Sequence, residues 1–153
     1  MHFCNQREHF AEPSILLDKN PIKVVTEAKF LGVIFDGTLS YSSHVNYLKT
    51  NCLKSLDIVK VVGHTDWGAD KKTLLYLYRA LVRSKLDYGC IAYGAASNNI
   101  IKKLDPIHHQ GLRIALGAFR TSPVTSLYAK AQEMSLKNRR MKLSVNYVLK
   151  QKT

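Results

Sequence analysis

The spacing of apolar residues changes once along this chain, at Asp36-Gly37. Before that point, residues 22–26 and 29–35 are short runs rich in Val, Ile and Phe, which predicts the two strands of a hairpin. Glu27-Ala28 is the expected turn between them. After that point, apolar residues recur at intervals of three and four, the period of a helix with one buried face. The sequence therefore predicts a mainly α fold, with a short β-hairpin followed by a bundle of about five helices.

Local signals place the ends of these helices. Helix starts are expected at Ser42 or Ser43, Asp70, near Ser97, residues 121–123 and near Leu136. Short hydroxyl and carboxylate side chains cap helix N-termini, which is why Ser and Asp mark several of these starts. Gly63 ends the first helix, because glycine suits the residue that follows a helix. Pro106 interrupts the third helical stretch and predicts a kink or a break there.

Positive charge is the strongest compositional signal. The chain of 153 residues has 23 Lys and Arg against 11 Asp and Glu, a net charge of +12. From residue 106 onward there are nine basic residues and one acid, Glu133, which concentrates +8 in the last third. A field of this sign attracts polyanions, and a pI near 9.7 is typical of nucleic-acid-binding domains. The less specific interpretation is a basic soluble protein.

Several kinds of chemistry are not indicated. The chain has no paired aspartates, no phosphate-binding glycine loop and no HExxH motif, so we expect no catalytic residues. Cys4, Cys52 and Cys90 are far apart and the histidines lack metal-ligand spacing, so no metal site or disulfide framework is expected. No apolar run is long enough to span a membrane, and the first residues lack a secretory signal. We therefore expect a nuclear or cytoplasmic chain that is not secreted, with no membrane partner and no small-molecule substrate.

An ordered series of short motifs resembles the segment that follows the palm in reverse transcriptases of jockey-like non-LTR retrotransposons. The series reads KFLGVIFD at 29–36, LSY at 39–41, WGAD at 67–70, RSKLDYG at 83–89, LDPIH at 104–108, GAFRTSP at 117–123 and the pair Arg139-Arg140. Each motif is weak alone, but their order and spacing match over nearly the whole chain. Tyr41 departs from the pattern, because this position in the family is often Trp.

The resemblance implies a division of the chain. Residues 1–36 would be the end of the palm and the primer-grip hairpin, and residues 37–153 would be a helical thumb-like domain. In this family the paired catalytic aspartates and their Mg²⁺ belong to the palm, upstream of this segment. The implied function is that of a polymerase fragment without the palm, inactive alone and without a cofactor of its own. It would bind RNA–DNA hybrid or DNA duplex through backbone phosphates, independently of sequence.

Eight residues are the candidates for nucleic-acid contact: Lys29, Gly32, Arg113, Arg120, Thr121, Arg139, Arg140 and Lys142. By the resemblance, Gly32 lets the backbone approach the primer, although a simple bulge would also use glycine. Arg120-Thr121 precedes a helix, where backbone N–H groups favour phosphate. Arg113 has an alternative role, since its aliphatic stem could cover the edge of the core. Arg139, Arg140 and Lys142 form a basic run, for which ion pairing within the chain is the alternative.

Two other functions stay open. The chain could complete a polymerase in trans by docking on a separate palm, because an unpaired strand edge invites a partner. It could also be a decayed or domesticated product that serves as a helical protein-interaction module. The tyrosines at 76, 78, 88 and 93 are expected in the core and at its rim rather than stacked on bases.

Overall fold

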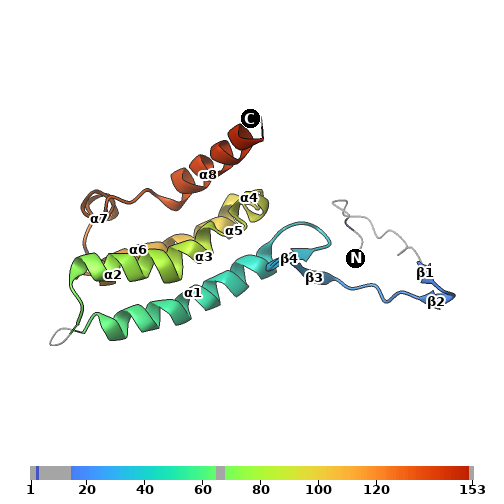
Figure 1. Ribbon diagram of the computed structural model, residues 1–153, viewed down its shortest axis with the longest axis horizontal. Helices are drawn as coiled ribbons and strands as arrows, with labels where there is room; N and C mark the ends of the chain where they lie inside the picture. Colours follow the sequence, from blue (N-terminus) through green and yellow to red (C-terminus); the bar gives the residue numbers. More distant parts are fainter. Residues whose placement is uncertain (1–2, 4–14, 65–67, 152–153) are drawn as a thin grey trace.

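The computed structural model describes residue 3, residues 15–64 and residues 68–151. Two short antiparallel hairpins come first, and α-helices follow (Figure 1). Strand β1 (Leu16–Leu17) pairs with β2 (Asn20–Pro21), and β3 (Glu27–Phe30) pairs with β4 (Val33–Asp36). The predicted class, a hairpin followed by a helical bundle, is confirmed.

The register of the main hairpin differs from the prediction. Residues 22–26 form no strand, and Glu27 and Ala28 pair with Asp36 and Phe35 instead of making the turn. The turn is Leu31-Gly32, with φ of 45° and 81°. Two successive residues with positive φ match the right-handed twist of the strands, which is why such turns are favoured in two-residue hairpins. The hairpin therefore lies a few residues later in the chain than the sequence indicates.

The predicted ends of the first two helices are confirmed, except for the N-cap of the first helix. Helix α1 (Ser42–Val62) stops at Gly63, and Asp70 caps α2 (Lys71–Tyr78) by accepting the Lys72 N–H at 3.1 Å. The predicted serine cap of α1 is wrong, because the N-cap is Tyr41, whose φ is 57°. The Asp36 carboxylate accepts the backbone N–H groups of Ser40 and Tyr41 at 2.9 and 2.8 Å, which fixes this unusual entry into the helix.

The other described helices form two continuous stretches and three separate segments. Helix α2 continues through a π-helical segment, η1 (Arg79–Arg83), into α3 (Ser84–Asp87), and α4 (Cys90–Tyr93) follows. Helix α5 (Asn98–Ile101) leads through a 3-10 turn, η2 (Lys102–Leu104), into α6 (Asp105–Leu116), so the break expected at Pro106 is present. Helices α7 (Val124–Ala131) and α8 (Leu136–Lys150) complete the described chain.

The core lies between α1, the α2–η1–α3 helix and α6. Tyr78, Tyr93 and Cys52 are completely buried, and Cys90 is almost completely buried. Burial raises the pKa of Cys52 to about 11, so this thiol is an inert core group. Helix α8 packs on α3 and α4, whereas β1 and β2 form the end of an arm directed away from the helices (Figure 1). None of the helices in the described ranges is long and apolar enough to cross a membrane.

Candidate nucleic-acid interface

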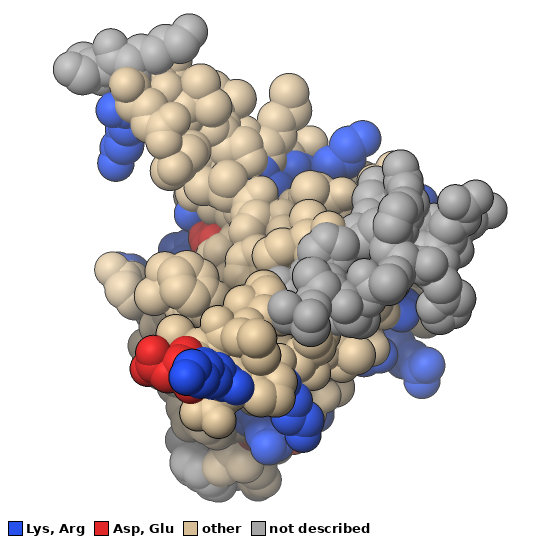
Figure 2. Space-filling view, turned by 90° about the vertical axis from the view of Figure 1, so that its right-hand side faces the viewer, with Lys and Arg blue, Asp and Glu red and all other residues tan. Residues whose placement is uncertain are grey.

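Several acidic side chains of the described residues have bonding partners within the chain. Asp36 and Asp70 accept backbone N–H groups at helix starts, and Asp57 pairs with Lys60 on the surface. Asp87 and Glu133 are held by arginines. The basic excess therefore reaches the surface largely without neutralisation, and on the face in Figure 2 Lys and Arg outnumber acidic residues. The eight candidate residues are distributed over three separate places on this surface.

Lys29 and Gly32 lie at a cleft of about 450 Å³ between the β3–β4 hairpin, α1 and α3. Lys29 Nζ donates to Tyr47 Oη at 3.1 Å and lies 4.7 Å from the centroid of that ring. Lys85 also lines this cleft, and its Nζ donates to Ser55 Oγ at 2.6 Å. Two ammonium groups therefore face one cleft, an arrangement that attracts an anion.

His44 lines the same cleft and is only 3% exposed. Its Nδ1 accepts the Ile34 N–H at 3.3 Å, which leaves the proton of the neutral ring on Nε2. Nε2 has no hydrogen-bond partner among the described residues. Burial and the nearby Lys29 lower the pKa of His44, so the ring is neutral near pH 7. The cleft wall therefore includes a neutral ring whose Nε2 is buried, beside the two lysines.

Tyr88 fixes the hairpin turn against α3. Its hydroxyl donates to the Leu31 carbonyl at 2.6 Å, and a Cβ built on Gly32 would lie 3.2 Å from its ring. Positive φ and this close approach both favour glycine at position 32. Gly32 thus serves a hairpin turn rather than a bulge, and its contact with nucleic acid stays a prediction.

Arg113 and Arg120 meet at a second cleft, of about 810 Å³, where α6 ends beside the C-terminal end of α1. Lys60 is the third basic residue in its lining, and the lining includes no acid. Arg113 Nη2 donates to the Ser122 carbonyl at 3.2 Å, while its Nε is buried without a partner in the described chain. Thr121 is exposed next to Arg120. The cleft is suited to phosphate, and Arg113 also has the structural contact that was its alternative role.

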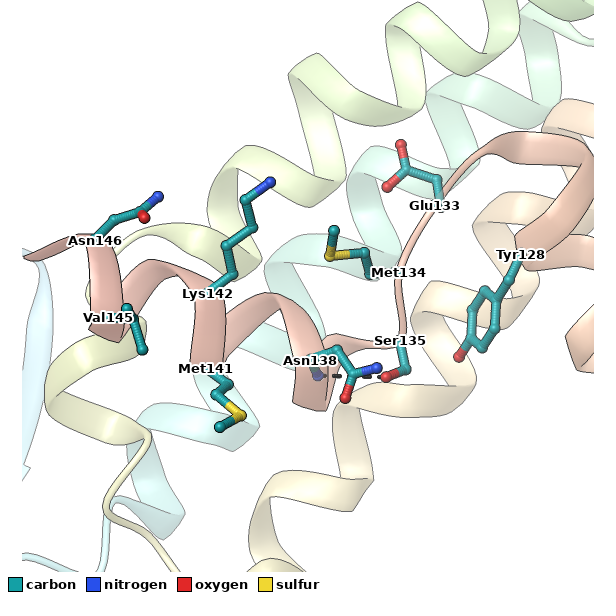
Figure 3. A pocket seen from close by; sticks show the side chains of 9 residues that line it. All are labelled: Tyr128, Glu133, Met134, Ser135, Asn138, Met141, Lys142, Val145 and Asn146. Atoms are coloured by element: carbon teal, nitrogen blue, oxygen red, sulfur yellow. Dashed lines mark hydrogen bonds between the residues drawn. The ribbon is translucent and has the colours of Figure 1, made fainter.

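The three basic residues of α8, Arg139, Arg140 and Lys142, differ in burial and in bonding partners. Arg139 donates Nε and Nη2 to Asp87 and is half-buried. Arg140 is also half-buried. It lies near Cys90, where burial raises the pKa of the thiol and the positive charge of Arg140 partly opposes that rise. Lys142 is exposed and lines an open groove of about 730 Å³ with Met141 and Val145 (Figure 3). Of the three, Lys142 has its charge most available to a ligand.

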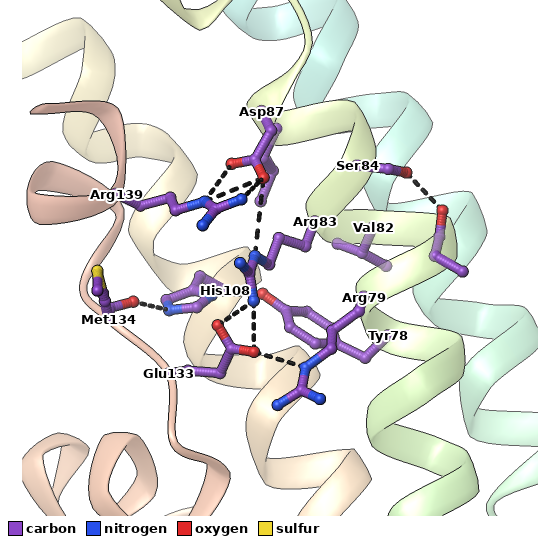
Figure 4. Close-up of polar contacts among 12 residues, drawn as sticks. Tyr78, Arg79, Val82, Arg83, Ser84, Asp87, His108, Glu133, Met134 and Arg139 are labelled. Atoms are coloured by element: carbon purple, nitrogen blue, oxygen red, sulfur yellow. Dashed lines mark hydrogen bonds and ion pairs between the residues drawn. The ribbon is translucent and has the colours of Figure 1, made fainter. Parts of the chain in front are cut away.

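A buried polar network connects α8 and the segment before it to the core (Figure 4). Glu133 accepts Arg79 Nε at 2.7 Å and also pairs with Arg83, while Arg79 Nη2 donates to the Ala131 carbonyl at 3.1 Å. These arginines belong to the π-helical segment η1. Glu133 and Arg83 are largely removed from water, whereas the Arg79 side chain is 40% exposed. The network therefore orients the α7–α8 connection, and the charges of both arginines are paired with Glu133.

The histidines of α6 are also structural. His108 contacts the Tyr78 hydroxyl through Nδ1 and the Met134 carbonyl through Nε2, at 3.0 Å for the latter. His109 Nε2 contacts the Tyr128 hydroxyl at 2.8 Å. Within the described ranges there is no group of three or more His, Cys, Asp and Glu that could hold a metal ion.

Sequence reasoning did not identify four residues of these clefts: His44, Tyr47, Lys60 and Lys85. Lys85 carried a usable signal, since it lies inside the motif at 83–89. The other three lie on α1 at positions that look like ordinary helix surface or core, and only the packing of the hairpin and of α6 shows that they line clefts.

The chain is similar to a curated protein of Drosophila melanogaster described as a probable RNA-directed DNA polymerase from transposon X-element. The two are 27% identical over 120 residues, which is 74% of this chain and 13% of the relative. This similarity supports a place among the reverse transcriptases. The chain thus spans a small part of the relative, and no family model and no solved structure matches it.

Proposed function

We propose that this chain is the primer-grip and thumb part of a jockey-like reverse transcriptase and that it binds the template–primer hybrid through backbone phosphates. The similarity to a transposon polymerase supports the family, and the ordered motifs support this segment of it. Binding of this kind is independent of sequence, because phosphate contacts position a duplex without reading its bases.

The distribution of charge carries the proposal. Asp87 and Glu133 are occupied by arginines of the fold, whereas Lys29, Lys85, Arg113, Arg120 and Lys142 lie at surface clefts or grooves. A chain at +12, in which several acidic side chains are paired within the fold, has a surface potential that attracts a polyanion. These cations lie in two separate clefts and one groove. Because they are spread apart, they suit the repeated phosphates of a nucleic acid better than a single small anion.

Fluorescence anisotropy against labelled RNA–DNA hybrid, duplex DNA and a single strand tests the proposal across a salt series. We expect the hybrid to bind best. A plot of log affinity against log salt concentration should be a falling line, whose slope is about 0.9 for each phosphate neutralised. The double variant Lys29→Gln, Lys85→Gln is expected to lower that slope by about 2. The matched control is Lys102→Gln, Lys103→Gln, two exposed lysines of η2 outside the described clefts. Equal slopes for both double variants, or no binding near physiological salt, would overturn the proposal.

Docking on a separate palm is the second candidate function, and the exposed hairpin arm favours it. Leu16, Leu17, Phe30 and Leu31 are each more than 60% exposed. Leu16 and Leu17 lie at the end of the arm, whereas Phe30 and Leu31 lie at the β3–β4 turn. Exposed large apolar side chains are typical of a surface that another chain covers. Co-expression with the palm-bearing segment of the Drosophila relative tests this candidate. Co-purification that is lost in the variant Leu16→Ser, Leu17→Ser would support it, and equal recovery of both forms would refute it.

A further inference from the structure

The connection between α6 and α7 carries an aromatic side chain that the fold leaves in solvent. Phe119 is 83% exposed, more than any other large apolar residue described. It lies between Ala118 and Arg120, both of which line the cleft at the end of α6. Exposing a phenylalanine to this degree forgoes the stabilisation that burial of its ring would give. Packing within the described fold therefore does not account for this residue.

The neighbouring cleft supplies what an aromatic platform needs to bind a nucleotide. Lys60, Arg113 and Arg120 line it, and no carboxylate does, although Lys60 also pairs with Asp57 outside the lining at 2.8 Å. Its volume of about 810 Å³ lies within the range of small-ligand sites. The bond from Arg113 to the Ser122 carbonyl fixes its guanidinium at the wall of the cleft. Cations along a groove beside an exposed ring are the combination by which proteins hold unpaired strands.

Other exposed aromatics do not share this setting. Tyr88 is occupied, since its hydroxyl bonds the Leu31 carbonyl and its ring faces Gly32. Tyr76 is 67% exposed on α2, but it lines none of the clefts described above. Phe119 does not itself line the cleft, but it differs from these tyrosines because both of its chain neighbours, Ala118 and Arg120, do. Tyr76 serves as a matched control for loss of an exposed ring.

We propose that the α6–α7 connection is a binding site for an unpaired strand that extends from the duplex. Phe119 stacks on a base of that strand, and Lys60, Arg113 and Arg120 hold its phosphates. The site prefers no particular sequence, because every base offers a face for stacking. Its position beside a duplex rests on the proposed function, whereas the capacity to bind a single strand does not.

Two labelled hybrids of equal duplex length test the site, one blunt and one with an unpaired RNA extension of five nucleotides. We expect the unaltered chain to bind the extended hybrid at least about fivefold more tightly, the lower end of the effect of one stacked base. Phe119→Ala should lose this preference while its affinity for the blunt hybrid stays the same. Phe119→Trp should keep it, and Tyr76→Ala should behave as the unaltered chain.

A second readout reports stacking directly. With 2-aminopurine in the extension, contact with Phe119 changes the fluorescence of the base, and Phe119→Ala abolishes that change. Because Phe119 is exposed, this variant should fold as the unaltered chain does, which circular dichroism checks. Lys60→Gln with Arg120→Gln should weaken binding of the extended hybrid and lower its salt slope by about 2.

The outcomes separate the two proposals. Equal affinities for blunt and extended hybrids, or a Phe119→Ala variant that retains the preference, would overturn the strand site and leave duplex binding intact. Binding of the isolated single strand that depends on Phe119, without binding of blunt hybrid, would support the strand site and overturn the duplex clamp. No binding of any of these nucleic acids would overturn both.

Discussion

Arg139 on α8 donates both Nη2 and Nε to Asp87 Oδ2 on α3, at 2.9 and 3.1 Å. This bidentate pair raises the pKa of the already basic Arg139 and joins two helices that are about 50 residues apart in the chain. Lys142, three residues later, is exposed and its charge faces solvent. Neighbouring cations of one basic run thus differ in role, one stabilising the fold and the other available to a phosphate.

Replacing Arg139 should therefore affect stability more than binding. Arg139→Gln leaves Asp87 with only the 3.7 Å pair to Arg83, and we expect unfolding free energy to fall by about 2 kcal/mol, as for lost hydrogen bonds to a charged group. Chemical denaturation measures this change. Lys142→Gln is the matched control, with stability within about 0.5 kcal/mol of the original and a salt slope lower by about 0.9. The reverse pattern would show that Arg139, not Lys142, contacts phosphate.

The helix boundaries that were predicted correctly are those set by residues close to them in the chain. Asp70, Gly63 and Pro106 act within one helical turn of their own positions, and each of these helix boundaries was confirmed. The hairpin register was wrong because Leu31-Gly32 lacks the Asn-Gly or Asp-Gly signal of a two-residue turn, and the β-branched run just before it resembles a strand.

Contacts between distant segments could not be predicted. The partners of Glu133 are Arg79 and Arg83, about 50 residues away, and single-sequence patterns carry no information on such pairs. The same applies to the candidate site. Arg113 and Arg120 were identified from local chemistry, but Lys60 joins them only because α1 and α6 end at the same place.

Gly111 is expected to be intolerant of any side chain. A Cβ at this position would lie 2.4 and 2.5 Å from ring carbons of Tyr78, which is fully buried and bonded to His108. We expect Gly111→Ala to lower unfolding free energy by about 3 kcal/mol, at the upper end of overpacking effects. Gly117→Ala is the control, since its φ of 60° adds strain but nothing lies within 4 Å. A larger loss at Gly117 in thermal denaturation would contradict this account.

Tyr88→Phe should loosen the hairpin while the bundle stays folded. The ring would remain against Gly32, but the bond to the Leu31 carbonyl would be lost. A partly exposed hydrogen bond contributes about 1 kcal/mol, so amide exchange of the β3–β4 hairpin should quicken about fivefold. Exchange in α1 and α6 is the internal control and should not change. Uniform acceleration across the chain would mean that the hairpin and the bundle unfold together.

Stability is expected to fall as the pH drops from about 6.5 to 4, because His108 is buried as a neutral ring. Burial lowers the pKa of His108 to about 4, whereas the unfolded chain has a value near 6.5. Between these values the unfolded state binds a proton that the folded state does not, so unfolding free energy decreases with falling pH. Each pKa unit corresponds to about 1.4 kcal/mol, which gives a loss on the order of 3 kcal/mol. Above pH 6.5 this contribution is fully present.

Denaturant unfolding at constant ionic strength, from pH 7.5 to 4.5, measures this dependence. His44 and His109 also have lowered pKa values from burial, so they add to the slope in the same direction. His108→Phe should be less stable at pH 7.5, because the Tyr78 hydroxyl and the Met134 carbonyl lose their partner. It should nevertheless show a shallower pH slope, since one of the three buried rings no longer titrates. An unchanged slope in this variant would mean that His108 titrates in the folded chain as it does in the unfolded one.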